Sequence, residues 1–287
     1  MKIAMSGATG FIGGNLIKLF NEKGWIVEPL LAEDFKGREE TLARKLQDSE
    51  VVINLAGAPI VAKWTEEYKK ILYSSRIDTT NKIVSLLSAQ NPKPRLFIST
   101  SAVGIYDGSG IYSEDNAVYA DDFLGMLASE WEKSAIKAAN YGIRTVIFRF
   151  GIVLGSNGGM LSQMLPIFKL GLGGTIGDGS QGFSWVHIED LKRAYLEAIE
   201  NDKFAGVYNL TAPTPTTNKG LTKALGKALK VPAIFKIPYF ALKLKYGEGV
   251  IAISGGQKVL PKRLLEAGFK FKYETIEEAL KDLLSKP

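Results

Sequence analysis

The sequence contains no cysteine and only one histidine, His187. Without cysteine there is no disulfide framework, no thiolate nucleophile and no thiolate metal site, and a single histidine cannot form a histidine metal cluster. No apolar run approaches the ~20 residues that a membrane-spanning helix needs, and the short run after Met1 and Lys2 does not have the pattern of a signal peptide. We therefore expect a soluble, cytoplasmic protein without a metal site.

Acidic residues are scarce at the C-terminal end. Residues 1–218 carry 22 basic against 24 acidic side chains (net −2), whereas residues 219–287 carry 14 against 6 (net +8). A basic lobe can face an anionic small molecule, a nucleic acid or a membrane surface, or it can be a solvated lysine-rich face. The lysines alternate with apolar residues and do not cluster with aromatic ones. The solvated face is therefore the favoured interpretation, with no nucleic acid and no membrane as partner.

The first 150 residues alternate short apolar runs with longer helical patterns. Apolar runs without polar alternation are typical of strands buried on both faces, and their βαβα order indicates a doubly wound parallel sheet of the Rossmann type. The predicted strands span 2–6, 25–31, 51–56, 95–100 and 144–150. The predicted helices lie near 13–23, 39–47, 65–90 and 122–141.

The pattern changes after Phe150, and three regions follow from it. Residues 1–150 are predicted to form the nucleotide-binding domain, which a strand near 206–211 rejoins. Residues 151–205, rich in glycine and with a helix near 161–170, are predicted to contribute loops and helices to a substrate cleft. Residues 212–287 are predicted to form a smaller, mainly helical, basic lobe. Ligands in such folds bind at the carboxyl edge of the sheet.

A glycine-rich turn, SGATGFIGG at 6–14, follows the first strand and opens a helix. Gly7 permits the tight turn, Gly10 lets backbone N–H groups approach a pyrophosphate, and Gly13 allows close packing of helix on strand. The phosphates then lie at the positive end of the helix. The turn predicts a dinucleotide site, NAD or NADP, formed by Gly7, Ala8, Thr9, Gly10, Phe11, Ile12 and Gly13.

The choice between NAD and NADP depends on the end of the second strand. An acidic residue there holds a ribose 2′-hydroxyl, and arginine accommodates a 2′-phosphate. The segment after Leu31 offers both charges, in Glu33, Asp34, Lys36 and Arg38, so both cofactors stay open.

Together with the glycine turn, the stretches NLAG at 54–57 and STSAVGIYDG at 99–108 resemble the extended short-chain dehydrogenase/reductases, which include nucleotide-sugar epimerases and dehydratases. The resemblance narrows to an atypical subgroup, the "epimerase family" proteins with a distinctive C-terminal domain. It covers nearly the whole chain, and its longest marks are RFGIVLGSNGGML (149–161), LGLGGTIGDGSQGFSWVHIEDL (170–191) and GGQKVLPKRLLEAGFKF (255–271).

The resemblance implies roles for residues at the strand ends. Ser101 matches the catalytic serine that hydrogen-bonds a substrate oxygen, and Arg76 lies near the position of an active-site asparagine, where a cation can hold cofactor phosphates or a substrate carboxylate. Lys63, Trp64 and Trp185 are expected to border the substrate pocket. The remaining positions expected to contact the cofactor are Leu55, Ala56, Gly57, Ser99, Thr100, Gly151 and Ile152.

The family's catalytic tyrosine and lysine are missing. With Glu132 aligned to the acidic residue that follows the pair, the two positions hold Leu124 and Ala128, and no tyrosine with a lysine four residues later occurs from 101 to 141. The nearest replacements are Tyr106, which we take as the candidate acid/base, and Tyr112.

Two other chemical options are disfavoured. A dehydratase needs an acidic residue directly after the serine, where Ala102 and Val103 stand. His187 begins a His–x–x–Asp run at a helix start, with Asp190 as an expected helix cap, and a structural role is favoured for this histidine.

Three functions are compatible with the sequence. The favoured one is an NAD(P)-dependent oxidoreductase or epimerase-like enzyme that acts on an unidentified small molecule, for which an anionic group is one option. The alternative is a non-catalytic NAD(P)-binding sensor or regulatory protein, which the missing pair would permit. A nucleic-acid or membrane-associated protein that works through its basic lobe is the least favoured.

Overall fold

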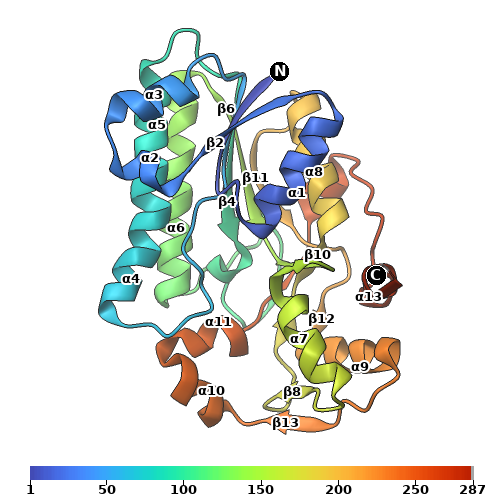
Figure 1. The fold of residues 1–287 in the computed structure, drawn as a ribbon. Helices are drawn as coiled ribbons and strands as arrows, with labels where there is room; N and C mark the ends of the chain where they lie inside the picture. The colour runs from blue at the N-terminus through green and yellow to red at the C-terminus, as the bar shows by residue number, and fades with distance from the viewer. Residues whose placement is uncertain (286–287) are drawn as a thin grey trace.

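The computed structural model describes residues 1–285 and is built on one parallel sheet (Figure 1). Its six strands lie in the order β11-β6-β4-β3-β1-β2, and every neighbouring pair is parallel. Each predicted strand is present, and the returning strand is β11 at the edge of the sheet. The strands are β1 (Lys2–Ser6), β2 (Ile26–Leu30), β3 (Val51–Asn54), β4 (Leu96–Ala102), β6 (Arg144–Phe150) and β11 (Gly206–Leu210). The fold is therefore the predicted doubly wound α/β architecture.

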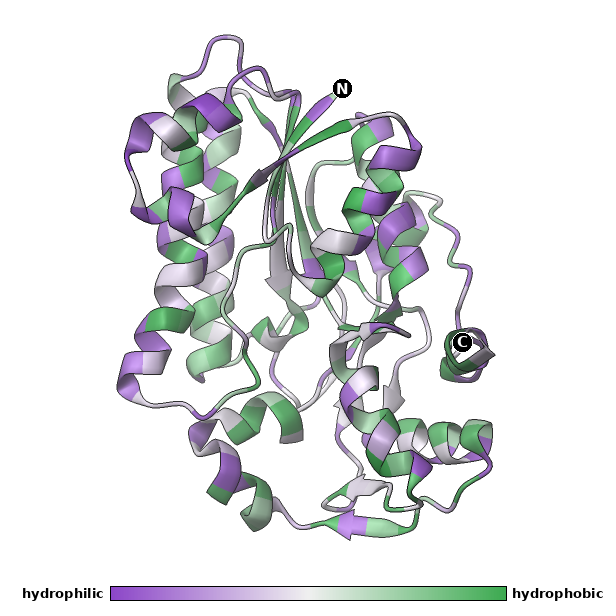
Figure 2. Ribbon diagram, in the orientation of Figure 1, coloured by the Kyte–Doolittle hydropathy of each residue, from purple (hydrophilic) through white to green (hydrophobic). Residues whose placement is uncertain are grey.

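Two layers of helices cover the sheet, and the alternation of side chains along the strands decides what each layer contacts. On β1, Ile3 and Met5 pack with α1 (Phe11–Glu22) and α8 (Ile188–Glu200). Ala4, between them, faces the opposite layer of α3 (Glu39–Leu46), α5 (Thr79–Ala89) and α6 (Phe123–Ile136). Figure 2 shows the apolar side of these helices turned toward the sheet. Helices bury both faces of the sheet, which explains why the strand sequences are continuous apolar runs.

The helix predicted at 65–90 is interrupted. It consists of α4 (Glu66–Tyr73), a π-helical turn (Ser74–Asp78) and α5. A π turn inserts one extra residue into the helix and often marks a functional site. This turn carries Arg76. A second departure is the short helix α2 (Ala32–Lys36), in the segment after β2 for which no helix was predicted.

The second lobe lies below the carboxyl edge of the sheet (Figure 1). Strand β7 (Ile152–Gly155) leads into it and pairs with β10 (Trp185–His187). Its core joins residues that are far apart in sequence, including Phe168, Leu225 and Leu280. Its other elements are α7 (Gly159–Lys169), β8 (Gly174–Ile176), β9 (Gly182–Phe183), β12 (Thr216–Thr217), α9 (Asn218–Leu229), β13 (Phe235–Ile237), α10 (Tyr239–Tyr246), α11 (Ile251–Ser254) and α13 (Ile276–Ser285).

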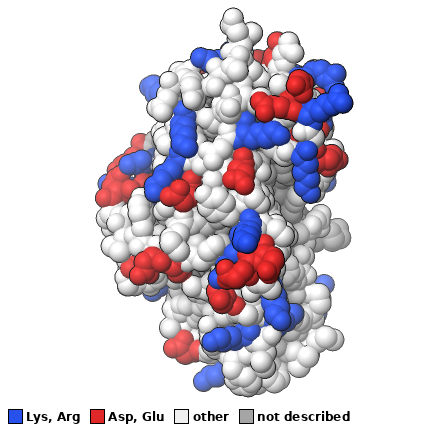
Figure 3. Space-filling view, turned by 90° about the vertical axis from the view of Figure 1, so that its left-hand side faces the viewer, with Lys and Arg blue, Asp and Glu red and all other residues white. Residues whose placement is uncertain are grey.

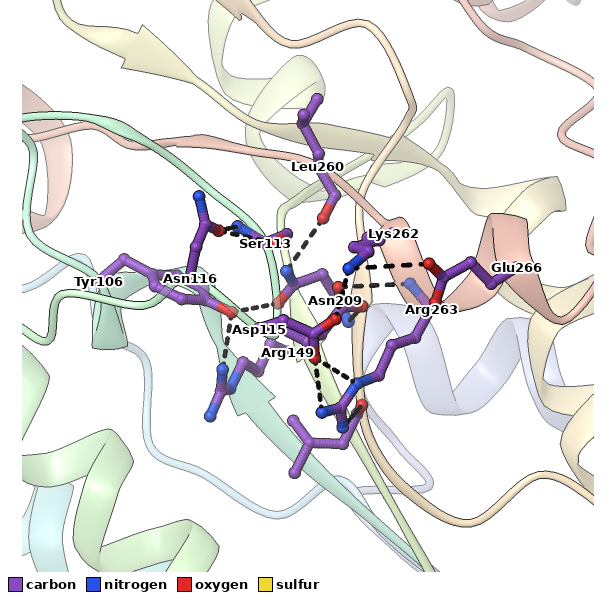
Figure 4. Close-up of polar contacts among 12 residues, drawn as sticks. Tyr106, Ser113, Asp115, Asn116, Arg149, Asn209, Leu260, Lys262, Arg263 and Glu266 are labelled. Atoms are coloured by element: carbon purple, nitrogen blue, oxygen red, sulfur yellow. Dashed lines mark hydrogen bonds and ion pairs between the residues drawn. The ribbon is translucent and has the colours of Figure 1, made fainter.

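Polar contacts fix the C-terminal chain to the sheet (Figure 4). β14 (Lys258–Val259) pairs with β5 (Ile111–Tyr112), and α12 (Lys262–Glu266) follows it. The Asn209 amide donates to the Leu260 carbonyl at 3.0 Å, and Asp115 pairs with Lys262 at 2.7 Å and with Arg263 at 2.8 Å. The C-terminal region is thus held by the last strand of the sheet and by the loop after β5.

The start of α8 corrects one detail of the sequence interpretation. His187, and not Asp190, caps the helix, because its Nδ1 accepts from the Glu189 N–H at 3.0 Å. Asp190 is fully buried and accepts from the backbone N–H groups of Lys272 (2.7 Å) and Tyr273 (3.0 Å). It therefore anchors the C-terminal chain. Within residues 1–285, no helix is long and apolar enough to cross a membrane.

Candidate functional site

The glycine turn after β1 has the geometry of a phosphate-binding turn. Gly7 has a φ of +68°, and a Cβ there would lie 2.7 Å from the Leu55 carbonyl oxygen. A Cβ on Gly13 would lie 2.3 Å from the Gly7 carbonyl oxygen, so only glycine lets α1 approach the turn this closely. Helix α1 begins at Phe11 without a side-chain cap, and its first N–H groups are open to an anion. The turn therefore meets the steric requirements that its sequence predicts.

Two clefts flank this turn and share Gly7, Ala56 and Gly57 in their walls. The first, of about 520 Å³, lies under the carboxyl ends of β4 and β6 and reaches into the second lobe. The second, of about 880 Å³, extends past the end of β2 toward α5. Of the predicted cofactor residues, the first cleft is lined by Gly7, Gly10, Phe11, Ile12, Gly13, Leu55, Ala56, Gly57, Arg76, Thr100, Gly151 and Ile152, and the second adds Ala8 and Thr9. Ser99 is fully buried and does not line either cleft.

The second cleft has charged side chains of both signs in its wall. Strand β2 ends in apolar residues, and Glu33, Lys36, Asp78 and Lys82 line the cleft beyond it. Lys82 Nζ donates to the Phe35 carbonyl at 2.8 Å. Asp34 is occupied: it accepts from the Leu31 N–H and from Lys45, both at 2.7 Å. Burial opposes the charge of Asp34, but these two donors outweigh it and lower its pKa. The wall therefore holds two lysines, either of which can bind a phosphate, and two carboxylates, Glu33 and Asp78.

Arg76 brings a cation to the wall of the first cleft. Its guanidinium donates to the carbonyl oxygens of Ala58 (3.0 Å) and Leu72 (3.3 Å) and lies 5.3 Å from the Trp131 ring centroid. It forms no ion pair with a carboxylate of residues 1–285, and burial lowers its pKa to about 10. It stays protonated at neutral pH with N–H groups to spare. Arg76 is therefore suited to hold an anion in the cleft.

Ser101 lines the first cleft and is held from behind by an ion pair. Its Oγ donates to Oε1 of Glu132 at 2.6 Å, and Arg149 binds both carboxylate oxygens of Glu132, at 2.8 and 2.7 Å. Ser101 and Arg149 are register partners on β4 and β6, and Glu132 reaches them from α6. Burial opposes the charge on Arg149, but Glu132 outweighs it and raises the pKa of Arg149. The serine hydroxyl is thus fixed at the cleft wall.

Tyr106, the candidate acid/base, lies outside the first cleft. It is fully buried, and its hydroxyl accepts from Arg149 at 2.6 Å and donates to Asn209 Oδ1 at 2.8 Å (Figure 4). Burial raises its pKa despite the opposing effect of Arg149. The Tyr112 ring stacks on it with centroids 5.6 Å apart, and the Tyr112 hydroxyl donates to Asp107. Both hydroxyls are engaged in contacts away from the cleft, so neither is placed for proton transfer there.

One face of α6 carries the two positions at which a tyrosine and a lysine were expected. Leu124 lines the first cleft, and Ala128, one turn later, is buried against Val103 and Tyr106. Glu132 follows after another turn on the same face and holds Ser101. A phenol at 124 would therefore project into the cleft, and the chain has an isobutyl group instead.

The predicted substrate residues lie elsewhere. Lys63 is exposed, and Trp64 is buried with its Nε1 donating to the Ile60 carbonyl at 3.0 Å. Trp185 is fully buried in the core of the second lobe. None of the three is among the described residues that line either cleft.

Instead, the second lobe supplies residues that sequence reasoning missed. Phe183 and Ser184 form part of the wall of the first cleft, together with Ile251, Ala252 and the 255–257 segment. The Ser184 Oγ accepts from the Val259 N–H and donates to the Gln257 carbonyl, both at 2.8 Å, which holds this segment in place. The sequence signal for the C-terminal part of this wall is the long run GGQKVLPKRL, whose first three residues are 255–257.

Comparison with known proteins identifies the family of this chain. Residues 3–211 match the NAD dependent epimerase/dehydratase family, and residues 237–283 match a domain of unknown function, DUF1731. The chain is 38% identical over 303 residues to the chloroplastic SDR39U1 homolog of Arabidopsis thaliana, covering 99% of this chain and 87% of the relative. It is 36% identical over 294 residues to the mouse epimerase family protein SDR39U1, covering 99% and 100%.

Solved structures give the same assignment. The crystal structure of human epimerase family protein SDR39U1 (isoform 2) with NADPH matches with a TM-score of 0.91 and 32% identity, covering all of both chains. UDP-glucuronic acid 4-epimerase from Bacillus cereus, at 20% identity and a TM-score of 0.81, shares the fold, covering 99% of this chain and 98% of the enzyme. The chain therefore belongs to the NAD dependent epimerase/dehydratase family and is similar over its whole length to the SDR39U1 proteins.

Proposed function

We propose that this chain binds NADPH across the two clefts and catalyses a slow oxidoreductase reaction on a small molecule beside Ser101. The adenosine end would lie in the second cleft, near Lys36 and Lys82, and the pyrophosphate at the N-terminus of α1. The nicotinamide end would reach the first cleft, between Gly151 and Ser101. The observation that carries the proposal is the hydroxyl of Ser101, fixed on the wall of a cleft that begins at the glycine turn.

Ser101 would position the reacting oxygen of the substrate. Its proton is directed at Glu132, so the lone pairs of Oγ are available to accept from a substrate hydroxyl. To donate to a carbonyl oxygen, the hydroxyl must rotate away from Glu132, which Arg149 holds in place. When bound, NADPH would supply the hydride, and solvent would supply the proton that completes the product hydroxyl, because Leu124 stands where the family has a phenol.

The rate is expected to be low, because no phenol faces the cleft wall at Leu124. Loss of a general acid or base costs roughly 10²–10⁴-fold, while the orientation of the reactants is retained. Arg76 keeps one part of the family's arrangement, a cation beside the cofactor, although it comes from the π-helical turn and not from α6. We assign Arg76 to an anionic or hydroxyl group of the bound cofactor or substrate.

The first experiment measures cofactor binding by NADPH fluorescence. The wild-type chain is expected to bind NADPH more tightly than NADH. Arg76→Met is expected to raise the NADPH dissociation constant by about tenfold, the effect of one lost charged hydrogen bond. The matched control is Arg44→Met, which changes an exposed arginine of α3. Failure of the wild type to bind either cofactor would refute the proposal.

The second experiment asks whether the bound cofactor is used. A panel of carbonyl compounds is screened for NADPH oxidation by the wild type, by Ser101→Ala and by the control Ser88→Ala, whose hydroxyl contacts only a carbonyl of its own helix. Turnover that Ser101→Ala lowers by about 10²-fold, with unchanged NADPH affinity, supports the enzyme. Turnover that both variants retain excludes Ser101 from the reaction.

A non-catalytic NADPH-binding sensor is the second candidate. The observation that favours it is the apolar face formed by Leu124 and Ala128, which leaves no proton donor of α6 at the cleft. Tight NADPH binding without oxidation of any compound in the panel would support the sensor over the enzyme.

A further inference from the structure

The lower edge of the second lobe exposes large apolar side chains. Leu170 is 74% exposed, Ile234 79%, Phe240 67% and Leu244 79%. Together with Ile167 and Leu172, also exposed, these residues define what we call the lower apolar surface. None of them lines either cleft within the described chain. Six exposed apolar side chains in one region call for an explanation, because a monomer rarely leaves such a surface uncovered.

The six residues come from segments that lie side by side. β13 pairs with β8, and the Phe235 N–H donates to the Gly173 carbonyl at 3.3 Å, so the turn after α7 lies next to residues 234–235. α10 starts directly after β13, with Pro238 as its N-cap. Figure 1 shows α10, β13 and β8 along the lower edge of the molecule, and Figure 2 shows apolar and polar residues alternating there.

Two carboxylates flank these segments: Asp178 follows β8, and Glu248, which pairs with Lys69, follows α10. Residues 203–247 contain eight lysines and no aspartate, glutamate or arginine, and residues 151–177 contain one lysine, Lys169, and no acidic residue. Lys169, Lys236, Lys243 and Lys245 are exposed among the apolar side chains, and none has a carboxylate of residues 1–285 within ion-pair distance. Figure 3 shows basic and acidic side chains spaced over a largely uncharged surface at the lower end of one side of the molecule.

We propose that the lower apolar surface docks on an anionic lipid bilayer. Apolar side chains enter the boundary between headgroups and acyl chains while lysines, which have long apolar stems, meet the lipid phosphates. Each lysine near an anionic surface strengthens binding roughly fivefold. The surface thus offers the two contributions that reversible interfacial binding requires, and its charge complements one partner, an anionic leaflet.

Other partners fit this surface less well. Interfaces between proteins are enriched in arginine and depleted in lysine, the reverse of what residues 203–247 contain. Nucleic-acid sites combine basic side chains with aromatic stacking platforms. These segments also expose Phe235, Tyr239 and Phe240, but their most exposed side chains, Leu170, Ile234 and Leu244, are aliphatic. Exposed aliphatic side chains beside lysines favour a lipid interface.

Docking would bring the first cleft close to the bilayer. α10 and α11 are separated only by residues 247–250, and Ile251 and Ala252 of α11 line the cleft. The Trp64 N–H donates to the Tyr246 carbonyl at 3.3 Å, which joins the end of α10 to the sheet domain. The helix that would contact lipid is therefore continuous with the wall of the cleft.

The test is co-sedimentation of the full chain with vesicles. Vesicles of phosphatidylcholine mixed with phosphatidylglycerol are expected to retain the protein, vesicles of phosphatidylcholine alone are expected not to, and high salt is expected to release it. Leu170→Ser and Leu244→Ser should each weaken retention about tenfold, because the variant lacks the leucine side chain whose transfer from water into the bilayer stabilises the bound state. The control is Ile26→Ser, at a residue 69% exposed at the start of β2.

A charge variant separates the electrostatic part. Lys243→Gln with Lys245→Gln should weaken binding to the mixed vesicles roughly 25-fold, whereas Lys18→Gln with Lys93→Gln, at exposed lysines elsewhere, should not. All variants must melt at the wild-type temperature. Equal retention by both kinds of vesicle, or equal losses in the control variants, overturns the proposal.

Two other results would also overturn it. Retention on single-stranded or duplex DNA that the same lysine variants abolish would assign the surface to a nucleic acid. A dimer in solution that Leu244→Ser dissociates would assign it to a second copy of this chain. The vesicle assay requires no NADPH, so its outcome is independent of the proposed oxidoreductase function.

Discussion

Replacement of Glu132 by alanine is the most informative single perturbation of the site. Glu132 is the only acidic side chain of residues 1–285 that pairs with Arg149, and the side chains of Glu132 and Arg149 are 12% and 4% exposed. It also accepts the proton of Ser101. Truncation leaves a buried guanidinium with Tyr106 and Tyr119 as its remaining partners, so the charge loses its counter-ion without returning to water.

The expected loss follows from burial. Removal of one partner of a buried ion pair costs about 3–5 kcal/mol, because the remaining charge is uncompensated. With an unfolding entropy of ~2.1 cal/mol/K per residue, the 287 residues give about 0.6 kcal/mol/K. The melting temperature of Glu132→Ala should therefore fall by about 5–8 °C. The double variant Glu132→Leu/Arg149→Met should recover much of this loss, because it leaves no unpaired charge.

The assay is thermal unfolding with a matched control on the same helix. Glu130→Ala removes an exposed partner of Lys133, two residues away, and should cost less than about 0.5 kcal/mol. NADPH binding is measured in parallel, since Ser101 loses its acceptor in Glu132→Ala. The reasoning about a buried pair is wrong if Glu132→Ala has the same melting temperature as Glu130→Ala. It is also wrong if the double variant is less stable than Glu132→Ala.

Three further predictions concern the rest of the molecule. Gly13→Ala should destabilise the fold and weaken NADPH binding at least tenfold in a fluorescence titration, because its Cβ would lie 2.3 Å from the Gly7 carbonyl oxygen. Gly14→Ala should instead raise the free energy of unfolding by about 0.5–1 kcal/mol, because a Cβ there has no atom of another segment within 4 Å. Lys82→Met should weaken NADPH more than NADH in the same titration, because only NADPH carries a 2′-phosphate; equal losses would contradict the charge argument. Burial raises the pKa of Glu114, so the folded state holds its proton more tightly than the unfolded state does. The free energy of unfolding in urea should therefore fall as pH rises from the usual value of 4.5 through the raised one, and Glu114→Gln should remove that part of the slope.

The sheet could be predicted because burial on both faces leaves a plain record in the sequence. The observed β1 and β6 have the bounds predicted for them, and the other predicted strands shift by no more than two residues at either end. The interruption of the helix at 65–90 left no such record. A π-helical turn adds one residue to a helix, and the spacing of apolar residues in the sequence changes too little to show it. The placement of Arg76 on such a turn could therefore not be predicted from spacing.

The cofactor side of the site could be predicted from the sequence more fully than the substrate side. A phosphate-binding turn depends on the backbone, and the backbone demands glycine at Gly7 and Gly13, so sequence and geometry correspond one to one. The direction of Trp64 and Trp185 depends on tertiary packing. Both fill apolar cores, as large aromatic side chains most often do, and the cleft is closed instead by segments 183–184 and 251–257.

One face of α6 explains how the site keeps its serine without its proton-transfer pair. Leu124, Ala128 and Glu132 are spaced four residues apart, and only the last is polar. Glu132 binds Arg149, whose register partner is Ser101, so the same ion pair that stabilises the junction of α6 with the sheet also sets the direction of the serine hydroxyl. Loss of either partner alone would destabilise the fold whether or not the protein turns over a substrate. The orientation of Ser101 is therefore maintained by folding alone, and only a change in NADPH oxidation on Ser101→Ala distinguishes a working active site from a binding site built on the same contacts.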